Sequence, residues 1–121
     1  KKTLNITNKN DVKNFCKTNT ITHIINCAAY TAVDKAEDEK VLANNINHIA
    51  VKNMASISKE LNISLVHIST DYVFDGTNHI PYKEDDSTNP NGIYGQTKLD
   101  GEKAIIESNL NNSIIIRTSW A

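Results

Sequence analysis

Residues 50–76 read AVKNMASISKELNISLVHISTDYVFDG, and this stretch decides the fold. Through its first half and the residues before it, apolar residues recur every three or four positions. That spacing predicts a helix from Asp38 to Leu61, ended by Asn62. The run Leu65 to Ile68 then predicts a short buried strand. A helix followed at once by a buried strand is half of a βαβ unit, so the stretch favours a parallel sheet.

The same alternation continues on both sides of this stretch. The other predicted elements, in chain order, are a helix over residues 8–19 capped by Thr7 or Asn8, a strand over Ile21–Cys27, a loop over Thr70–Asn91, a helix over about Ile93–Asn109 and a strand over Ser113–Arg117. Helix and strand thus follow one another three times. This order predicts an α/β fold with a doubly wound parallel sheet that has helices on both faces.

Composition narrows the class of protein. The 121 residues are enough for one domain with one hydrophobic core, and 39% of them are hydrophobic. The net charge of -1 gives no basic surplus for nucleic acid, and no apolar run approaches the roughly 20 residues of a membrane span. Cys16 and Cys27 form neither a CxxC motif nor a disulfide framework, which favours a reducing, cytoplasmic location.

Tyr94 and Lys98 form a YxxxK pair inside a predicted helix. Residues four apart lie on one helix face, so the ammonium group of Lys98 would lie near the phenol of Tyr94. A nearby cation favours the phenolate and lowers the tyrosine pKa from its usual value of about 10. The pair is therefore a candidate acid/base unit for interconverting a carbonyl and an alcohol. Taken alone, the pair is better explained as part of an exposed helix face.

Ligands of doubly wound sheets bind beyond the carboxyl ends of the strands. Those ends are here Cys27–Val33, Ser69–Asp75 and Thr118–Ala121. Hydroxyls in the second segment could hydrogen-bond a substrate carbonyl, and small residues in the first would let a flat ligand approach the backbone. Turn formation and close packing of strand against helix explain the same residues without a ligand. Trp120 fits either a stacked ligand or the core.

The histidines give no sign of a metal site. Their spacing is not that of metal ligands, and they are His23, His48, His67 and His79. Because His67 lies inside an apolar strand, we predict that it is a core histidine with its hydrogen bonds satisfied.

Four strings, in this order and at this spacing, resemble one family. They are NCAAYTAVDKAE (Asn26–Glu37), STDYVFDG (Ser69–Gly76), IYGQTKLDGE (Ile93–Glu102) and RTSW (Arg117–Trp120). With them the chain resembles, over essentially its whole length, the dTDP-4-dehydrorhamnose reductases of the extended short-chain dehydrogenase/reductase superfamily. The second and fourth strings together are the specific part, because YxxxK alone would mark only the superfamily.

The resemblance implies a partial, Rossmann-like NAD(P)-binding domain over residues 1–121 that carries a catalytic threonine, tyrosine and lysine. The first βαβ unit with its glycine-rich loop, and the C-terminal substrate region, would lie outside these residues. In the Rossmann strand order 3-2-1-4-5-6, Leu4–Ile6 would end strand 3, and the three predicted strands would be strands 4, 5 and 6. We therefore expect the 121 residues to be an internal part of a longer protein and inactive alone.

The resemblance also implies roles for single residues. Tyr94 would protonate the C4 oxygen of the sugar, Lys98 would lower the pKa of Tyr94 and bind the nicotinamide ribose, and Thr70 would hydrogen-bond the reacting carbonyl. The expected cofactor-binding residues are Asn5, Ile6, Ala28, Ala29, Tyr30, Ser69, Tyr94, Lys98 and Thr118. The expected substrate-binding residues are Thr70, Val73, Tyr94 and Trp120. Asn5 stands where the family usually has aspartate, and Asn47 matches a helix asparagine of the superfamily.

The implied reaction is hydride transfer from NADPH or NADH to the 4-keto group of dTDP-6-deoxy-L-lyxo-4-hexulose, which gives dTDP-L-rhamnose. The implied partners are this dTDP-sugar and, by family resemblance only, a second copy of the chain with Mg²⁺ at the dimer interface. Two alternatives stay open. One is another sugar-nucleotide reductase or epimerase of the superfamily, and the other is a non-catalytic regulatory subunit of the kind known for methionine adenosyltransferase.

Overall fold

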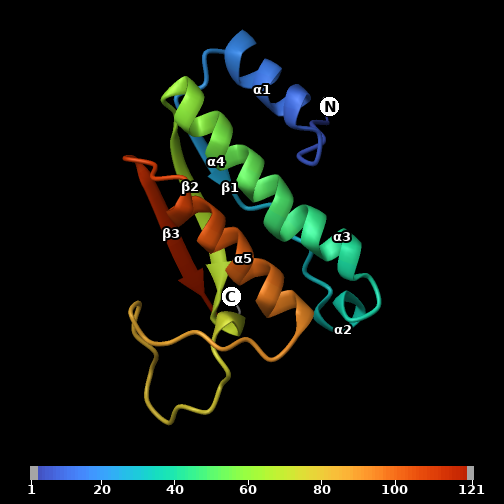
Figure 1. Cartoon of the computed structure of the whole chain (residues 1–121), viewed down its shortest axis with the longest axis vertical. Coiled ribbons are helices and arrows are strands. Elements are labelled where there is room, and N and C mark those ends of the chain that lie inside the picture. The colour runs from blue at the N-terminus through green and yellow to red at the C-terminus, as the bar shows by residue number, and fades with distance from the viewer. Residues whose placement is uncertain (1–2, 120–121) are drawn as a thin grey trace.

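A three-stranded parallel sheet forms one layer of the molecule (Figure 1). The computed structural model describes residues 3–119. The strands are β1 (His23–Asn26), β2 (Ser64–Thr70) and β3 (Ser113–Thr118), in the spatial order β1-β2-β3. Both strand pairs are parallel, so the predicted α/β fold with a parallel sheet is confirmed. The observed strand order is the one expected for Rossmann strands 4, 5 and 6.

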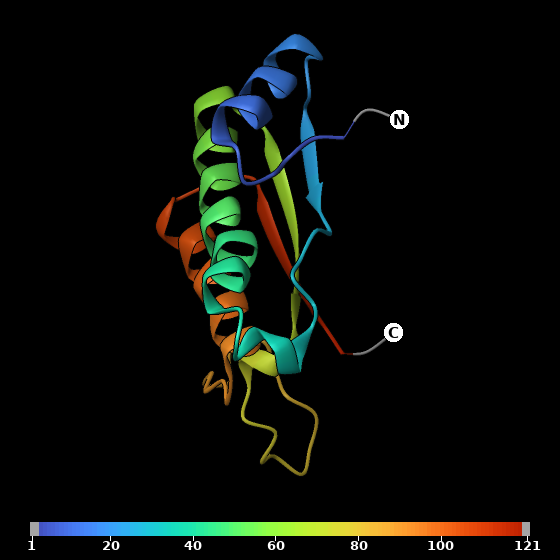
Figure 2. The same cartoon turned by 90° about the vertical axis from the view of Figure 1, so that its right-hand side faces the viewer.

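Helices form the second layer, and α1, α4 and α5 lie on the same side of the sheet (Figure 2). The helical elements are α1 (Lys9–Thr18), α2 (Val33–Ala36), α3 (Lys40–Asn44), the π-helical η1 (Asn45–Ile49), α4 (Ala50–Leu61), the 3₁₀ turn η2 (Asp71–Val73) and α5 (Ile93–Glu107). Within residues 3–119, none of these is long and apolar enough to cross a membrane.

The two faces of the sheet differ in burial. On the helix side, Leu65 of β2 packs with Val51 and Ala55 of α4 and with Ile105 of α5, and all four are buried. On the other side, Ile25, Ile114 and Ile116 are 68%, 59% and 44% exposed. The predicted cover of helices on both faces is therefore present on only one face in the described part of the chain.

The helix ends follow the predicted signals. Asn8 caps α1, because its side-chain oxygen accepts a hydrogen bond from the backbone N–H of Asp11 at 3.2 Å. Asn62 ends α4 in the left-handed conformation with φ 54°, which asparagine tolerates better than most residues. The loop between Val73 and Ile93 is irregular, as its Gly, Pro, Asn and Asp residues predict.

One expectation about the elements needs correction. The long helix begins two residues later than predicted and contains η1, in which Ala50 N–H bonds Asn45 O five residues back. The segment Leu4–Ile6, for which the neighbouring strands 1 and 2 are expected to lie outside these residues, forms no strand here. Instead, the Asn5 side chain accepts hydrogen bonds from Thr7 N at 3.0 Å and Thr7 Oγ1 at 2.7 Å, which makes a local turn.

Helix α5 lies directly on η1. A Cβ atom added to Gly101 would lie 2.3 Å from the backbone oxygen of Asn47, far inside van der Waals contact. Only glycine allows this approach, because any side chain would push the two helices apart. The contact fixes the height and rotation of α5 over the sheet.

We expect Gly101→Ala to destabilise the protein, although alanine is normally the better helix former. The added methyl group would meet the backbone of η1, and overpacking of this kind costs about 1–3 kcal/mol. Urea unfolding of the whole protein measures the loss. Ile106→Ala in the same helix, at a side chain that is 66% exposed, is the matched control and should change stability by less than about 0.5 kcal/mol. Equal stability of Gly101→Ala and wild type would contradict the close contact.

Candidate active site

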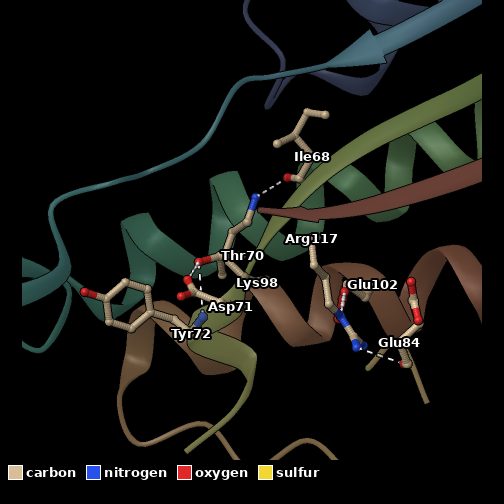
Figure 3. A network of polar contacts seen from close by, with 8 residues as sticks. All are labelled: Ile68, Thr70, Asp71, Tyr72, Glu84, Lys98, Glu102 and Arg117. Carbon is tan, nitrogen blue, oxygen red and sulfur yellow. Dashed lines mark hydrogen bonds and ion pairs between the residues drawn. The ribbon is translucent and has the colours of Figure 1, made fainter. Parts of the chain in front are cut away.

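The carboxyl end of β2 carries the first candidate residue. Thr70 is the last residue of β2, is buried, and has an extended backbone. Its Oγ1 accepts a hydrogen bond from Tyr72 N at 3.2 Å and donates one to Asp71 Oδ1 at 3.3 Å (Figure 3). The hydroxyl therefore caps the 3₁₀ turn η2 and is held at the edge of the sheet where ligands of such folds bind.

Tyr94 reaches the same place from the first turn of α5. Its half-buried ring lies edge-to-face with Tyr72, with ring centroids 5.4 Å apart. Burial raises the pKa of Tyr94, while its hydrogen bond with Thr70 acts in the opposite direction. Since the usual pKa of tyrosine is about 10 and burial raises it here, the phenol holds its proton at neutral pH. A protonated phenol beside a threonine hydroxyl is suited to donate a proton to a carbonyl oxygen.

Lys98 lies one turn further along α5 and is only 3% exposed. Its Nζ donates a hydrogen bond to the backbone oxygen of Ile68 at 2.7 Å (Figure 3). Burial lowers the pKa of Lys98, and nearby Glu102 opposes that shift. With Lys98 on Ile68 O, burial is the largest cause of the raised pKa of Tyr94, and the lowering by Lys98 stays a prediction.

Asn26 and His67 form a buried polar pair near Lys98. His67 is fully buried, and its Nδ1 accepts a hydrogen bond from Asn26 Nδ2 at 3.1 Å. Its Nε2 has no hydrogen-bond partner among the described residues, and neither has the buried Ser69 Oγ. Burial, followed by the charge of Lys98, lowers the pKa of His67 to about 4. His67 is thus a neutral core histidine as predicted, but only one of its ring nitrogens is satisfied.

Asn47 joins the end of β1 to α5. Its Oδ1 accepts a hydrogen bond from Tyr30 N at 2.9 Å, and its Nδ2 donates to Tyr30 O at 3.2 Å and to Thr97 Oγ1 at 3.1 Å. Tyr30 also donates its phenolic hydrogen to Glu39, which raises the pKa of Tyr30 to about 12. The buried amide of Asn47 thereby holds the segment with Ala28, Ala29 and Tyr30 against the helix that carries Tyr94.

A cleft of about 470 Å³ opens beside Tyr94. The residues that line it are Val33, Glu37, Asp71, Tyr72, Phe74, Asp75, Gly76, Tyr82, Asn91, Gly92, Tyr94 and Gly95. Val73 is not among them. It is fully buried and packs with Phe74 and Leu99, so its substrate contact stays a prediction.

The predicted cofactor-binding residues lie at different places: some lie beside β1, and Thr118 lies at the end of β3. Ile6 and Ala28 line a separate, largely apolar cavity of about 430 Å³ beside β1, and Asn5 turns its side chain toward Thr7. Thr118 is exposed at the end of β3, level with Thr70 in the strand register. Trp120 lies outside the described residues.

Glu37 is a candidate site residue that the sequence did not single out. Its Oε1 accepts a hydrogen bond from Ile93 N at 2.9 Å, so it caps the helix that carries Tyr94. The N-cap residue of α5, Gly92, has no side chain for this purpose. A carboxylate is the favoured partner of a helix N-terminus, but Glu37 and Ile93 are 56 positions apart, which hides the contact from sequence reading.

Comparison with known proteins agrees with this geometry. A family model described as "RmlD substrate binding domain" matches residues 1–121. The chain belongs to this family. A curated dTDP-4-dehydrorhamnose reductase from Salmonella typhimurium is 50% identical over 97 residues, which cover 80% of the chain and 32% of that protein. The chain therefore spans about a third of the length of this relative.

Solved structures of relatives in the family superpose closely. The crystal structure of a dTDP-4-dehydrorhamnose reductase from Clostridium acetobutylicum matches with a TM-score of 0.92 and 44% identity over 97% of the chain and 41% of that protein. A dTDP-4-dehydrorhamnose reductase from Bacillus anthracis, solved in complex with NADP, gives the same values. The predicted Rossmann-like fold, present in part, and the predicted family are thus confirmed. No three His, Cys, Asp or Glu side chains within residues 3–119 gather to hold a metal ion.

We expect Glu37→Ala to lower the free energy of unfolding by about 1 kcal/mol, the usual cost of losing a helix cap. Glu37→Gln keeps a side-chain oxygen for Ile93 N and should lose less. Asp38→Ala, in the same exposed acidic run, is the control. Urea unfolding of the three variants in the whole protein measures the effect. If Glu37→Ala and Asp38→Ala lowered the free energy of unfolding equally, the capping role of Glu37 would be contradicted.

His67 should make stability depend on pH. Its pKa is 6.5 in the unfolded chain and about 4 in the folded one, so the folded state binds this proton less tightly. The protein should lose about 2 kcal/mol from this residue between pH 7 and pH 5. Urea unfolding at the two pH values measures the loss. In His67→Gln, the loss of stability between pH 7 and pH 5 should be about 2 kcal/mol smaller than in the wild type, whatever the stability of the variant at pH 7. The same loss in the variant and the wild type would contradict a neutral buried histidine.

Proposed function

We propose that the chain is the catalytic middle part of an NAD(P)H-dependent reductase. The proposed reaction reduces the 4-keto group of dTDP-6-deoxy-L-lyxo-4-hexulose to give dTDP-L-rhamnose. Family membership and the names of the relatives support this reaction class. Residues 1–121 would then be a partial NAD(P)-binding domain, and activity would need the rest of the protein.

The observation that carries the proposal is the meeting of Thr70 and Tyr94 at the carboxyl end of β2. Thr70 would turn its hydroxyl hydrogen from Asp71 Oδ1 to the substrate C4 oxygen, and Tyr94 would donate the proton to that oxygen. The phenol of Tyr94 carries a proton to give at neutral pH, although burial raises its pKa and makes it a weaker acid than a free tyrosine. Partial burial strengthens both interactions, since less water competes for the oxygen.

The residues present fit a nicotinamide dinucleotide. Small side chains follow β1 at Ala28 and Ala29, the exposed hydroxyl of Thr118 ends β3, and the ammonium group of Lys98 lies between the two strands at Ile68 O. The cofactor would supply the hydride. Lys98 would hold the ribose hydroxyls, and Ala28 to Tyr30 would line the dinucleotide. Ser69, Asn5 and Ile6 remain proposed contacts of the same ligand.

Burial raises the pKa of Tyr94, whereas a cation close to the phenol lowers it. With Lys98 on Ile68 O, burial dominates and the phenol is a weak acid. A ligand hydroxyl that drew Lys98 toward Tyr94 would favour the phenolate, and so would ease proton release when the substrate is in place. The chain thus has a protonated donor ready before reaction.

The first experiment follows NADPH and NADH absorbance with this dTDP-sugar, using the whole protein and its Tyr94→Phe variant. Loss of the phenol removes the proton donor, so kcat should fall by about 10²–10⁴-fold. Calorimetric binding of NADPH should be little changed, which would show that the variant is folded. Lys103→Gln, on the exposed side of the same helix, is the activity control.

The outcomes separate the alternatives. An inert wild type with both cofactors would rule out this substrate and favour another ketosugar or a regulatory subunit. A product epimerised without net oxidation of the cofactor would identify an epimerase. Full activity of Tyr94→Phe would remove Tyr94 as the proton donor. The homodimer, Mg²⁺ at its interface and the cytoplasmic location remain predictions.

A further inference from the structure

Arg117 joins three of the four segments that carry the family resemblance: its own segment RTSW, the one with Glu102 and the one with Phe74. It lies in β3, and its guanidinium forms a two-pronged ion pair with Glu102 of α5, with Nε–Oε1 2.7 Å and Nη2–Oε2 3.2 Å (Figure 3). The Glu102 side chain is 2% exposed and that of Arg117 is 24% exposed. The carboxylate is therefore a buried anchor, and the arginine extends from it toward the surface.

The same guanidinium also holds the loop 74–91. Its Nη1 donates a hydrogen bond to the backbone oxygen of Glu84 at 3.1 Å. Its central carbon lies 5.1 Å from the centroid of the Phe74 ring, which stacks on Tyr82 at 4.1 Å with the rings nearly parallel. Tyr82 in turn donates its phenolic hydrogen to Asp75 Oδ1 at 3.1 Å. Arginine, two aromatic rings and a carboxylate thus form one continuous column.

This loop is one wall of the cleft that contains Tyr94. Of the loop residues, Phe74, Asp75, Gly76, Tyr82 and Asn91 line the cleft, whereas Arg117 does not. The position of the wall therefore depends on a residue that has no surface in the cleft. Glu102 lies four residues after Lys98, which itself follows Tyr94 by four, so one face of α5 carries the proton donor, the ammonium group and the anchor of the wall.

We propose that Arg117 is a positioning residue for the sugar-nucleotide substrate, because it fixes loop 74–91 against α5 through Glu102, Phe74 and Glu84. The inference rests on the proposed function and adds a determinant of substrate binding to it. Arginine is suited to this task, since its rigid planar fork can pair with a carboxylate, stack on a ring and bond a carbonyl at once. Lysine is a single point charge and can make only part of this set.

The test uses two variants of the whole protein. Arg117→Lys keeps a positive charge beside Glu102 but loses the fork and the flat surface over Phe74. The double variant Arg117→Met/Glu102→Gln removes both charges together, so that no buried carboxylate is left unpaired and the protein remains folded. Ile80→Ser is the control, because Ile80 lies in the same loop, is 65% exposed and takes no part in the column.

Hydrogen exchange of residues 75–91, followed by mass spectrometry, measures the loop without any assay of activity. Exchange should be roughly tenfold faster in both variants and unchanged in Ile80→Ser. The KM for the dTDP-sugar should rise about tenfold, because misplacing a wall of the cleft weakens substrate binding, while kcat and the KM for NADPH change less than about threefold.

A purely structural ion pair predicts a different result. It would lower the melting temperature without raising the KM for the sugar, and that result would overturn the proposal. Unchanged exchange in both variants, or an equal rise of KM in Ile80→Ser, would also overturn it. An inert wild type would instead overturn the proposed function together with the sugar-nucleotide part of this inference, and the exchange result would still decide whether Arg117 holds the loop.

Discussion

The contact between Gly101 of α5 and the backbone of Asn47 in η1 is the constraint on which the site depends. The absence of a side chain at Gly101 brings α5 close enough for Thr97 to receive a hydrogen bond from the Asn47 amide. That amide also holds both backbone groups of Tyr30. One buried asparagine therefore sets the distance between the end of β1 and the helix that carries the tyrosine and the lysine.

Much of the fold could be predicted because its signals are local. Asn8 and Asn62 mark helix ends by their own backbone and side-chain chemistry, and the isoleucines of β3 mark a strand by their run. The segment Leu4–Ile6 resembles a strand end, but the strands expected beside it lie outside residues 1–121, and it forms no strand here. A strand needs a neighbour for its hydrogen bonds, and here the Asn5 side chain forms a turn instead.

The candidate site could be located from sequence, but its electrostatics could not. The YxxxK spacing placed Tyr94 and Lys98 on one helix face, and the carboxyl-end rule placed Thr70 beside them. The spacing does not show that Lys98 donates a hydrogen bond to Ile68 O, nor that burial is the main cause of the raised pKa of Tyr94. Glu37 escaped notice for a similar reason, because its bond to Ile93 N exists only after the chain has folded.

The π-helical turn at Asn45–Ile49 limits how the chain can change length. A π turn holds one residue more than an α turn, so deleting one residue there would restore a regular helix. Because the wider turn takes up the extra residue, such a deletion would leave the helix on either side nearly in place and would change the position of Asn47 within the turn. Asn47 would then no longer face Tyr30 and Thr97. Insertions and deletions should thus be poorly tolerated in this single turn, because Asn47 joins the end of β1 to α5 there.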